Sequence, residues 1–223
     1  MKSSGEIIQY LEQFVSENKQ DKISEVLSQR TRYIAVVLEN IFQPHNASAV
    51  LRSCDCFGIQ NLHVIENENE YSPNQGVTIG ANKWIDIIHY NEKENNTVEA
   101  LRKLKAEGYR LIATTPHKDD VTLDELDISK GKFALVFGTE KDGLTELALE
   151  ECDEFVKIPM VGFSESFNIS VSAAICLHHV TTKLRETGLN WELTEKEKEM
   201  IKLDWYSKVI RNSELIIEEF TKQ

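Results

Sequence analysis

The chain has 223 residues, of which 41% are hydrophobic, enough for one ordinary domain with terminal additions. Its formal net charge of −12 argues against a general nucleic-acid binder, although it permits an RNA partner. No apolar run of membrane-spanning length and no signal segment follows Met1, and the four cysteines show no C-x-x-C spacing. We therefore expect a cytoplasmic protein with reduced cysteines and no membrane contact.

The first thirty residues predict two helical segments. Ile7, Ile8 and Leu11 share one face at helical spacing, and Asp21 is expected to cap the second segment. This arm ends at the basic residues Arg30 and Arg32. Ten of the twelve net negative charges lie between residues 61 and 156, so the two ends of the chain are close to neutral. The arm is therefore either a docked helix pair with exposed charges or a contact for RNA.

Six short apolar runs predict strands, and the segments between several of them predict helices. The strands are expected at residues 33–38, 62–65, 84–89, 109–115, 133–137 and 155–158. Helices are expected over residues 46–57 and 98–106, from about residue 144, and over residues 169–184. Alternation of this kind predicts an α/β fold with a mainly parallel sheet.

The helix after the first strand carries one conspicuous charge. Asn46 is predicted to be its N-cap, and Gly58 is predicted to end it. Ala49, Val50, Ser53 and Phe57 are expected to form its buried stripe. Arg52 lies off that stripe, and by itself it would be read as a solvated helix residue.

Two successive strands end in loops of small residues that lead into helices. Gly138 opens the turn after residues 133–137, and a loop of glycine, serine and asparagine follows residues 155–158. In open α/β sheets, ligands bind outside the carboxyl ends of strands, where helix N-termini present unpaired N–H groups. We therefore expect these two loops to hold a small polar ligand.

The tail beyond Gly188 predicts another capped helix. Thr194 followed by Glu197 has the spacing of a capping box. Ile201 and Trp205 offer apolar contacts, whereas Lys202 offers positive charge. The tail is either a docked helix with a solvated face or a second RNA contact.

Several common motifs are absent from the sequence. There is no G-x-G-x-x-G after the first strand, no P-loop and no G-x-S-x-G turn for a nucleophilic serine. There is also no H-E-x-x-H motif and no cluster of cysteine and histidine. We therefore expect no dinucleotide site of the Rossmann type and no metal.

Three ordered motifs nevertheless resemble those of the SpoU branch of the SPOUT class, RNA ribose 2'-O-methyltransferases that use S-adenosylmethionine. They are NASAVLR at 46–52, FALVFGTEKDGLT at 133–145 and IPMVGFSESFNISVSAA at 158–174, and the resemblance covers residues 31–187. It implies a parallel-sheet SPOUT fold with a C-terminal deep trefoil knot, an arrangement that chain-topology rules alone would reject. It also implies a homodimer in which catalytic groups meet across the interface.

The resemblance assigns roles to individual residues. The implied catalytic set is Arg52, Asn46, Glu140, Ser166 and Asn168. The implied S-adenosylmethionine site lies at three converging strand ends and consists of Thr114, Gly138, Gly143, Ile158, Met160, Phe167 and Asn168. Because the pKa of a guanidinium exceeds about 12, Arg52 is a poor base. We expect it to bind a substrate phosphate and to stabilise the oxyanion that develops on the ribose.

The same resemblance implies a methyltransferase domain at residues 31–188 between helical extensions at 1–30 and 189–223. The expected RNA contacts are Arg30, Arg32, Arg52 and Lys202. Family members that modify large ribosomal RNA often carry an extra domain, so the short arms favour those that methylate the D-loop guanosine of tRNA. Methylation of ribosomal RNA, a non-catalytic RNA-binding role, and an enzyme acting on a small molecule or protein are the alternatives.

Overall fold

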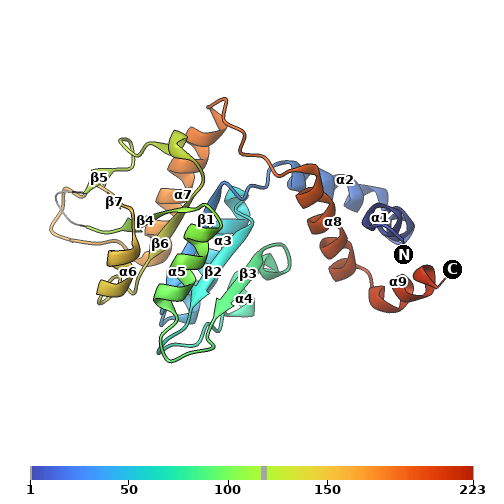
Figure 1. Cartoon of the computed structure of the whole chain (residues 1–223), viewed down its shortest axis with the longest axis horizontal. Helices are drawn as coiled ribbons and strands as arrows, with labels where there is room; N and C mark the ends of the chain where they lie inside the picture. The colour runs from blue at the N-terminus through green and yellow to red at the C-terminus, as the bar shows by residue number, and fades with distance from the viewer. Residues whose placement is uncertain (1, 117–119, 223) are drawn as a thin grey trace. The chain divides into compact units, whose positions relative to one another are not determined.

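The computed structural model describes residues 2–116 and 120–222. These residues form two compact units. One unit contains residues 32–191 and consists of a sheet covered by helices (Figure 1). The other contains the described residues up to 31 and from 192 onward, and it consists of helices.

The sheet of the larger unit has seven strands within the described residues, and every pair is parallel. The strands are β1 (Ile34–Glu39), β2 (Asn61–Ile65), β3 (Asp86–Tyr90), β4 (Arg110–Thr114), β5 (Val121–Thr122), β6 (Phe133–Phe137) and β7 (Glu154–Lys157). Their spatial order is β3-β2-β1-β6-β4-β7-β5. The expected parallel α/β sheet is confirmed, whereas the trefoil knot stays a prediction.

Helices cover both faces of this sheet. The helical elements of the unit are α3 (Pro44–Phe57), α4 (Gln75–Thr78), α5 (Thr97–Ala106), α6 (Glu146–Glu151), α7 (Ile169–Arg185), and the 3₁₀ turns η1 (Ala81–Lys83) and η2 (Ile128–Lys130). Helices α5 and α6 lie on one face, and α3 and α7 lie on the other (Figure 1). Because a parallel sheet is covered on both faces, its strands read as continuous apolar runs.

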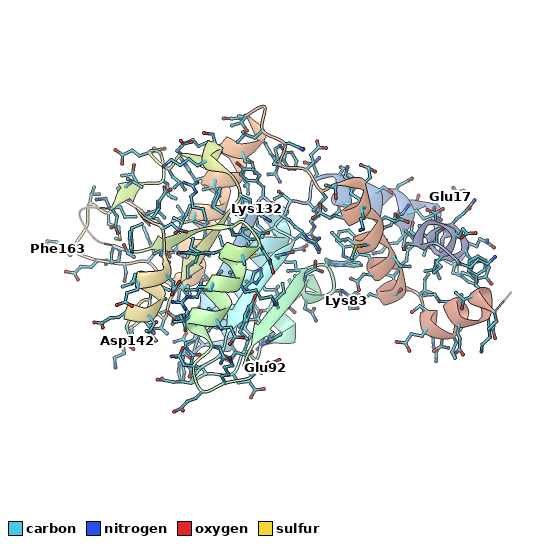
Figure 2. All side chains as sticks on the ribbon, in the orientation of Figure 1. Glu17, Lys83, Glu92, Lys132, Asp142 and Phe163 are labelled. Atoms are coloured by element: carbon cyan, nitrogen blue, oxygen red, sulfur yellow. The ribbon has the colours of Figure 1, made fainter. Side chains whose placement is uncertain are left out.

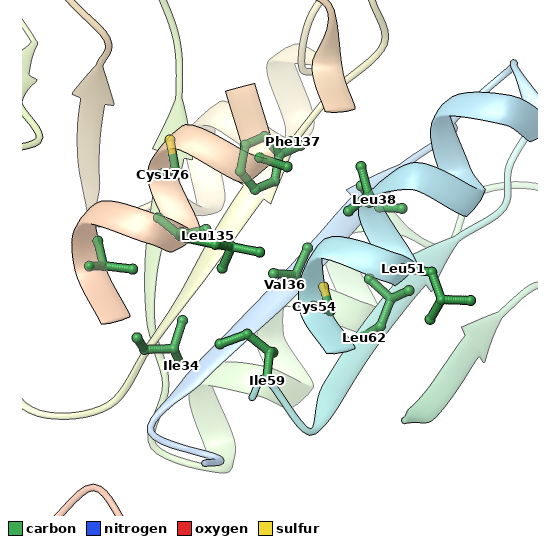
Figure 3. Packing of buried hydrophobic residues seen from close by; sticks show 14 of the residues in the cluster. Ile34, Val36, Leu38, Leu51, Cys54, Ile59, Leu62, Leu135, Phe137 and Cys176 are labelled. Atoms are coloured by element: carbon green, nitrogen blue, oxygen red, sulfur yellow. The ribbon is translucent and has the colours of Figure 1, made fainter. Parts of the chain in front are cut away.

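Strand β1 shows how the alternation of side chains builds the two core layers. Ile34, Val36 and Leu38 belong to the cluster that α3 and α7 cover (Figure 3). Ala35 and Val37 belong to the cluster under α5. All five residues are fully buried, as expected when successive side chains of a central strand point to opposite faces.

The start of α3 corrects one local prediction. The helix begins at Pro44 with Gln43 as its N-cap, so Asn46 lies inside the first turn and is not the cap. Proline is favoured at this first helical position because its fixed φ suits the helix and its missing N–H would have had no partner. The helix ends at Gly58, which has φ +80° as expected.

The buried face of α3 is also shifted from the predicted stripe. The buried residues are Asn46, Ala47, Ser48, Val50, Leu51 and Cys54, whereas Ala49, Ser53 and Phe57 are only partly buried. The helical period alone does not say which face of α3 is buried. Packing against α7 decides which face it is. Arg52 is exposed, as its place off the stripe predicted.

The smaller unit is built from α1 (Ser4–Glu12), α2 (Glu17–Ser28), α8 (Glu195–Val209) and α9 (Ser213–Thr221). Thr194 and Glu197 form the predicted capping box of α8. Asp21 does not cap α2, since Ser16 is the N-cap. The Gln20 amide donates to the carbonyl oxygens of Glu12 and Val15 at 2.9 and 2.7 Å, which closes the turn between α1 and α2 before residue 21.

Candidate functional site

A pocket of about 410 Å³ lies at the carboxyl ends of three neighbouring strands, β6, β4 and β7. Its lining includes six of the seven residues expected to bind the cofactor, namely Thr114, Gly138, Gly143, Ile158, Met160 and Phe167. The seventh, Asn168, is not in the lining but lies between two residues that are, Phe167 and Ile169. The pocket thus occupies the edge of the sheet where the strand-to-helix loops predict a ligand.

The loop after β6 forms one wall of this pocket and is a tight fold of its own. Thr139 and Gly143 exchange backbone hydrogen bonds of 2.9 and 3.1 Å, and the Asp142 N–H donates to the Thr139 hydroxyl at 3.0 Å. A Cβ atom at residue 138 would lie 2.1 Å from the backbone of Gly143. Glycine is therefore the only residue that permits this close crossing at residue 138.

The loop after β7 and the start of α7 complete the lining. Ile158, Met160 and Phe167 supply apolar surface, and Glu165 and Ser166 supply polar groups. In the middle of the loop, between Met160 and Glu165, Phe163 is fully exposed and points away from the sheet (Figure 2). Cys176 of α7 also lines the pocket, but burial raises the pKa of its thiol to about 12. Cys176 is therefore a neutral packing residue and not a nucleophile.

A chain of side-chain hydrogen bonds joins all three sequence motifs. The amide of Asn46, which is 4% exposed, donates to the carboxylate of Glu140. The amide of Asn168 in turn donates to the Asn46 side-chain oxygen at 3.2 Å. Asn168 also accepts hydrogen bonds from the backbone N–H and the hydroxyl of Ser170 at 2.9 and 2.6 Å. Three of the five predicted catalytic residues are thus brought together.

Of the two predicted catalytic residues outside this hydrogen-bonded chain, Ser166 lines the pocket but Arg52 does not. Its side chain is exposed, and it is not part of the pocket lining. The reason is helical geometry, because six residues after Asn46 the helix has turned by more than one and a half turns. Asn46 therefore faces the interior, whereas Arg52 faces solvent.

The residues expected to contact RNA have different environments. Arg30 is 1% exposed, and its guanidinium lies over the Trp205 ring at 5.3 Å, a buried place that does not favour the expected RNA contact. A planar, weakly hydrated guanidinium is well suited to stacking on an indole in a buried place. Arg32 forms an ion pair with Asp86 at 2.7 Å, and Lys202 forms one with Glu12 at 2.8 Å.

Sequence reasoning missed several residues of the site. The Ser170 hydroxyl that binds Asn168 was part of the quoted motif but was given no role. The pocket lining also contains the charges of Lys141, Asp142 and Glu165. Their position in the two motif loops could have indicated a place in the pocket. Charged residues in loops are usually solvated, however, so the sequence alone did not single them out.

The described part of the chain contains no group of three or more histidine, cysteine, aspartate or glutamate side chains arranged to hold a metal ion. Within the same residues, no helix has both the length and the apolar character needed to cross a membrane. The four cysteines are free thiols.

Comparison with known families gives one match that covers most of the larger unit. The model of the SpoU rRNA Methylase family matches residues 33–178. This range contains β1 to β7, both pocket loops and the hydrogen-bonded residues of the three motifs.

Individual relatives are similar over 70 to 92% of the chain. The tRNA (guanosine(18)-2'-O)-methyltransferase of Borreliella burgdorferi is 38% identical over 206 residues, which is 92% of each chain. The crystal structure of the Aquifex aeolicus TrmH/SpoU tRNA modifying enzyme superposes with a TM-score of 0.77 at 31% identity, covering 87% of this chain and 98% of that one. The AdoMet-bound rRNA methyltransferase of Sinorhizobium meliloti shares the fold, with a TM-score of 0.60 at 22% identity over 70% of this chain and 58% of that one.

Proposed function

Because this chain belongs to the SpoU methylase family, we propose that it is an RNA 2'-O-methyltransferase that methylates the D-loop guanosine of tRNA, guanosine 18. Relatives that carry this activity in their names match this chain over about nine tenths of its length. The observation that carries the proposal is the hydrogen-bonded chain of Asn46, Glu140 and Asn168. It links the three motifs to one another and to the pocket lining, of which Glu140 is part.

The pocket fits S-adenosylmethionine as the methyl donor. Its volume of about 410 Å³ lies in the range of small-molecule sites. Gly138 and Gly143 let the backbone approach a ligand closely, and Ile158, Met160 and Phe167 offer apolar surface for adenine. The charged lining residues are Glu140, Asp142, Glu165 and Lys141, an anionic balance that suits a donor of net positive charge.

The residues of the chain would act mainly by positioning. S-adenosylmethionine supplies a methyl group bonded to a positively charged sulfur. The ribose 2'-oxygen must lie in line with that carbon and lose its proton as the new bond forms. Asn46, Glu140 and Asn168 are linked rigidly enough to orient the ribose, and Ser166 offers a further hydroxyl. The proposed role of Arg52 is to bind a phosphate and stabilise the developing oxyanion, since a guanidinium is too weak a base to accept the proton.

A homodimer is part of the proposal, because Arg52 has to reach a pocket from which it is absent in its own chain. Arg52 is exposed, and among residues 2–116 and 120–222 its side chain has no ion-pair or hydrogen-bond partner. Exposed apolar residues, including Val161, Phe163 and Val171, are available for an interface. In the dimer, Arg52 of one protomer would serve the pocket of its partner.

The remaining expectations complete the proposal. The deep trefoil knot would bring the loops that follow β6 and β7 together around the cofactor. The catalytic domain would span residues 31–188, with helical extensions at 1–30 and 189–223. The four free cysteines support a reducing compartment, and we place the reaction in the cytoplasm.

The test is incorporation of labelled methyl groups from S-adenosylmethionine into purified total tRNA, ribosomal RNA and protein, followed by mapping of the modified nucleotide. We expect label in tRNA only, at the ribose of guanosine 18 in the D-loop. Label in ribosomal RNA instead of tRNA would show that ribosomal RNA is the substrate. Binding of RNA without any transfer would indicate a non-catalytic RNA-binding protein, and label in protein would refute the RNA reaction.

A further inference from the structure

A buried carboxylate lies at the end of β1, beside the strand that leads into the pocket loop. Glu39 is the last residue of β1 and is 1% exposed. Its neighbour in the strand, Leu38, is in register with Phe137, the last residue of β6. Burying a carboxylate is costly unless hydrogen bonds compensate for the lost water. The partners of Glu39 therefore indicate what its burial achieves.

Glu39 accepts three hydrogen bonds, two of which come from one residue. The backbone N–H and the hydroxyl of Thr145 donate to its two carboxylate oxygens at 2.9 and 2.6 Å. The hydroxyl of Thr97, at the start of α5, donates at 2.7 Å. None of these donors is a cation, so the carboxylate is stabilised by oriented neutral donors. Hydrogen bonds to a charged acceptor are about twice as strong as neutral ones.

Thr145 lies where the pocket loop ends and the next helix begins. It is the N-cap of α6, and its hydroxyl accepts a hydrogen bond from the Ala148 N–H at 3.2 Å. The seven residues immediately before it, 138–144, all line the pocket. The position of Thr145 thus fixes the end of that wall.

The pocket loop has a second attachment at its other half, through Glu140 and Asn46. The loop is also held in shape by the paired backbones of Thr139 and Gly143, which close the turn that contains Glu140. A loop that is stiff inside and attached at two points moves as one piece when either attachment is lost. Glu39 is therefore in a position to set the placement of the whole wall without touching the ligand.

We propose that Glu39 is a positioning residue for the methyl donor, which holds the loop of residues 138–145 through Thr145. This inference rests on the proposed function, in which that loop binds S-adenosylmethionine. Glutamine has nearly the same shape as glutamate but no charge and only one oxygen for three donors. Losing a charge-assisted contact of this kind should raise the Kd for S-adenosylmethionine on the order of tenfold.

The experiment compares wild type with Glu39→Gln by calorimetric titration of S-adenosylmethionine, which reports the Kd and the binding-competent fraction separately. We expect a higher Kd at full stoichiometry, and a higher KM for the donor with a smaller change in kcat. A purely structural role would lower the competent fraction and leave the Kd of the folded protein unchanged. Thr145→Val should raise the Kd as Glu39→Gln does, whereas Thr145→Ser should keep the wild-type Kd. The double variant of Glu39→Gln and Thr145→Val should lose less binding free energy than the sum of the two single variants.

The matched control is Glu66→Gln. Glu66 is also buried, at 8% exposure, and follows the next strand of the sheet, β2. It accepts from the Tyr71 N–H at 2.7 Å and lies 2.7 Å from His89 Nδ1, and none of these residues lines the pocket. We expect Glu66→Gln to lower the free energy of unfolding and to leave the Kd within about twofold of wild type.

Hydrogen exchange of the free protein separates this inference from the proposed function. Amides of residues 138–145 should lose protection in Glu39→Gln and keep it in Glu66→Gln. A wild-type protein that does not bind S-adenosylmethionine would refute the proposed function and the donor-binding role of Glu39 together, whereas unchanged exchange would refute the attachment itself. Wild-type Kd in Glu39→Gln, or an equal rise in Glu66→Gln, would also overturn the inference.

Discussion

The side-chain nitrogen of Asn168 lies 3.2 Å from the side-chain oxygen of Asn46, across 122 positions of the sequence. Asn168 is the N-cap of α7, and Asn46 lies in the first turn of α3. This hydrogen bond therefore joins the N-terminal ends of two helices that also pack against each other in the core. Asn46 uses its nitrogen for Glu140, so the orientation of both amides follows from the donor and acceptor pattern.

Asn168→Ala should weaken the binding of S-adenosylmethionine and lower stability. The variant removes the bond to Asn46 and the cap of α7, whose loss typically costs about 1 kcal/mol. Asn168→Ser is the matched variant, because serine can cap the helix but cannot reach Asn46. Calorimetry and thermal unfolding distinguish the two effects. Binding of S-adenosylmethionine by Asn168→Ser at the wild-type Kd would show that only the cap matters.

Arg52→Ala should abolish methyl transfer while the fold and the binding of S-adenosylmethionine stay intact. The side chain is exposed, so its truncation leaves no cavity. Losing a contact that strengthens in the transition state should cost about 3 kcal/mol, roughly a hundredfold in rate. Arg52→Lys should recover little, because an ammonium cannot make a planar two-pronged contact. Single-turnover transfer to a tRNA transcript measures this, and near-normal turnover in Arg52→Ala would exclude Arg52 from the mechanism.

Gly138→Ala should disrupt the pocket wall. The added Cβ would lie 2.1 Å from the backbone of Gly143, which cannot yield as a flexible side chain would. Overpacking of this kind costs about 1–3 kcal/mol and should also displace the loop. Gly162→Ala is the control, because the nearest atom to its added Cβ is at 4.0 Å. Chemical denaturation should detect a loss of stability, and titration a loss of affinity for S-adenosylmethionine, in Gly138→Ala but not in Gly162→Ala.

Wild-type protein should sediment as a dimer at micromolar concentration, and Val171→Lys should shift it toward monomer. Val171 lies on α7 and is 43% exposed, although the residues on the opposite face of that helix are buried. A lysine in an apolar interface would be desolvated without a partner. Leu215→Lys on α9, at 61% exposure in the unmodified chain, serves as the control and should leave the dimer intact. A wild-type monomer would contradict the prediction.

His63 should make stability depend on pH. Burial lowers the pKa of its imidazole from 6.5 to about 4 in the folded protein. As the pH falls, His63 therefore binds a proton in the unfolded chain before it does so in the folded protein. Its contribution to the free energy of unfolding is complete above pH 6.5 and is lost between pH 6.5 and pH 4. The loss amounts to about 3 kcal/mol. Denaturant titrations of wild type and His63→Phe across this range should show a shallower decline in the variant, and parallel curves would refute the assignment.

Local sequence signals predicted helices and strands well where the residues of one strand or one helix cap determine the structure. The apolar run of residues 133–137 coincides with β6, because a strand buried on both faces needs no partner information to be recognised. Gly58 and the Thr194 capping box were equally direct, since each depends on neighbours within a few residues. The predicted cap at Asn46 failed because Pro44 already starts the helix.

The charge pattern was a poorer guide to individual contacts. Arg30 was expected at an RNA surface on the basis of its charge, yet it stacks on Trp205, 175 positions later in the sequence, in the interior of the smaller unit. Arg32 and Lys202 likewise have acidic partners that sequence spacing does not reveal. A long cationic side chain can be buried or paired as readily as solvated, and only its neighbours in space decide which.

The sequence by itself determined the strand–helix alternation, the glycines of the pocket loop and the identity of the three motifs, because these depend on local conformation and residue type. Only the tertiary structure decided that β6 lies between β1 and β4, which brings Glu39 to Thr145 and Asn46 to Glu140. These partners are 106 and 94 positions apart. Hydrogen bonds over such separations follow from strand order and helix packing, and no local propensity encodes them.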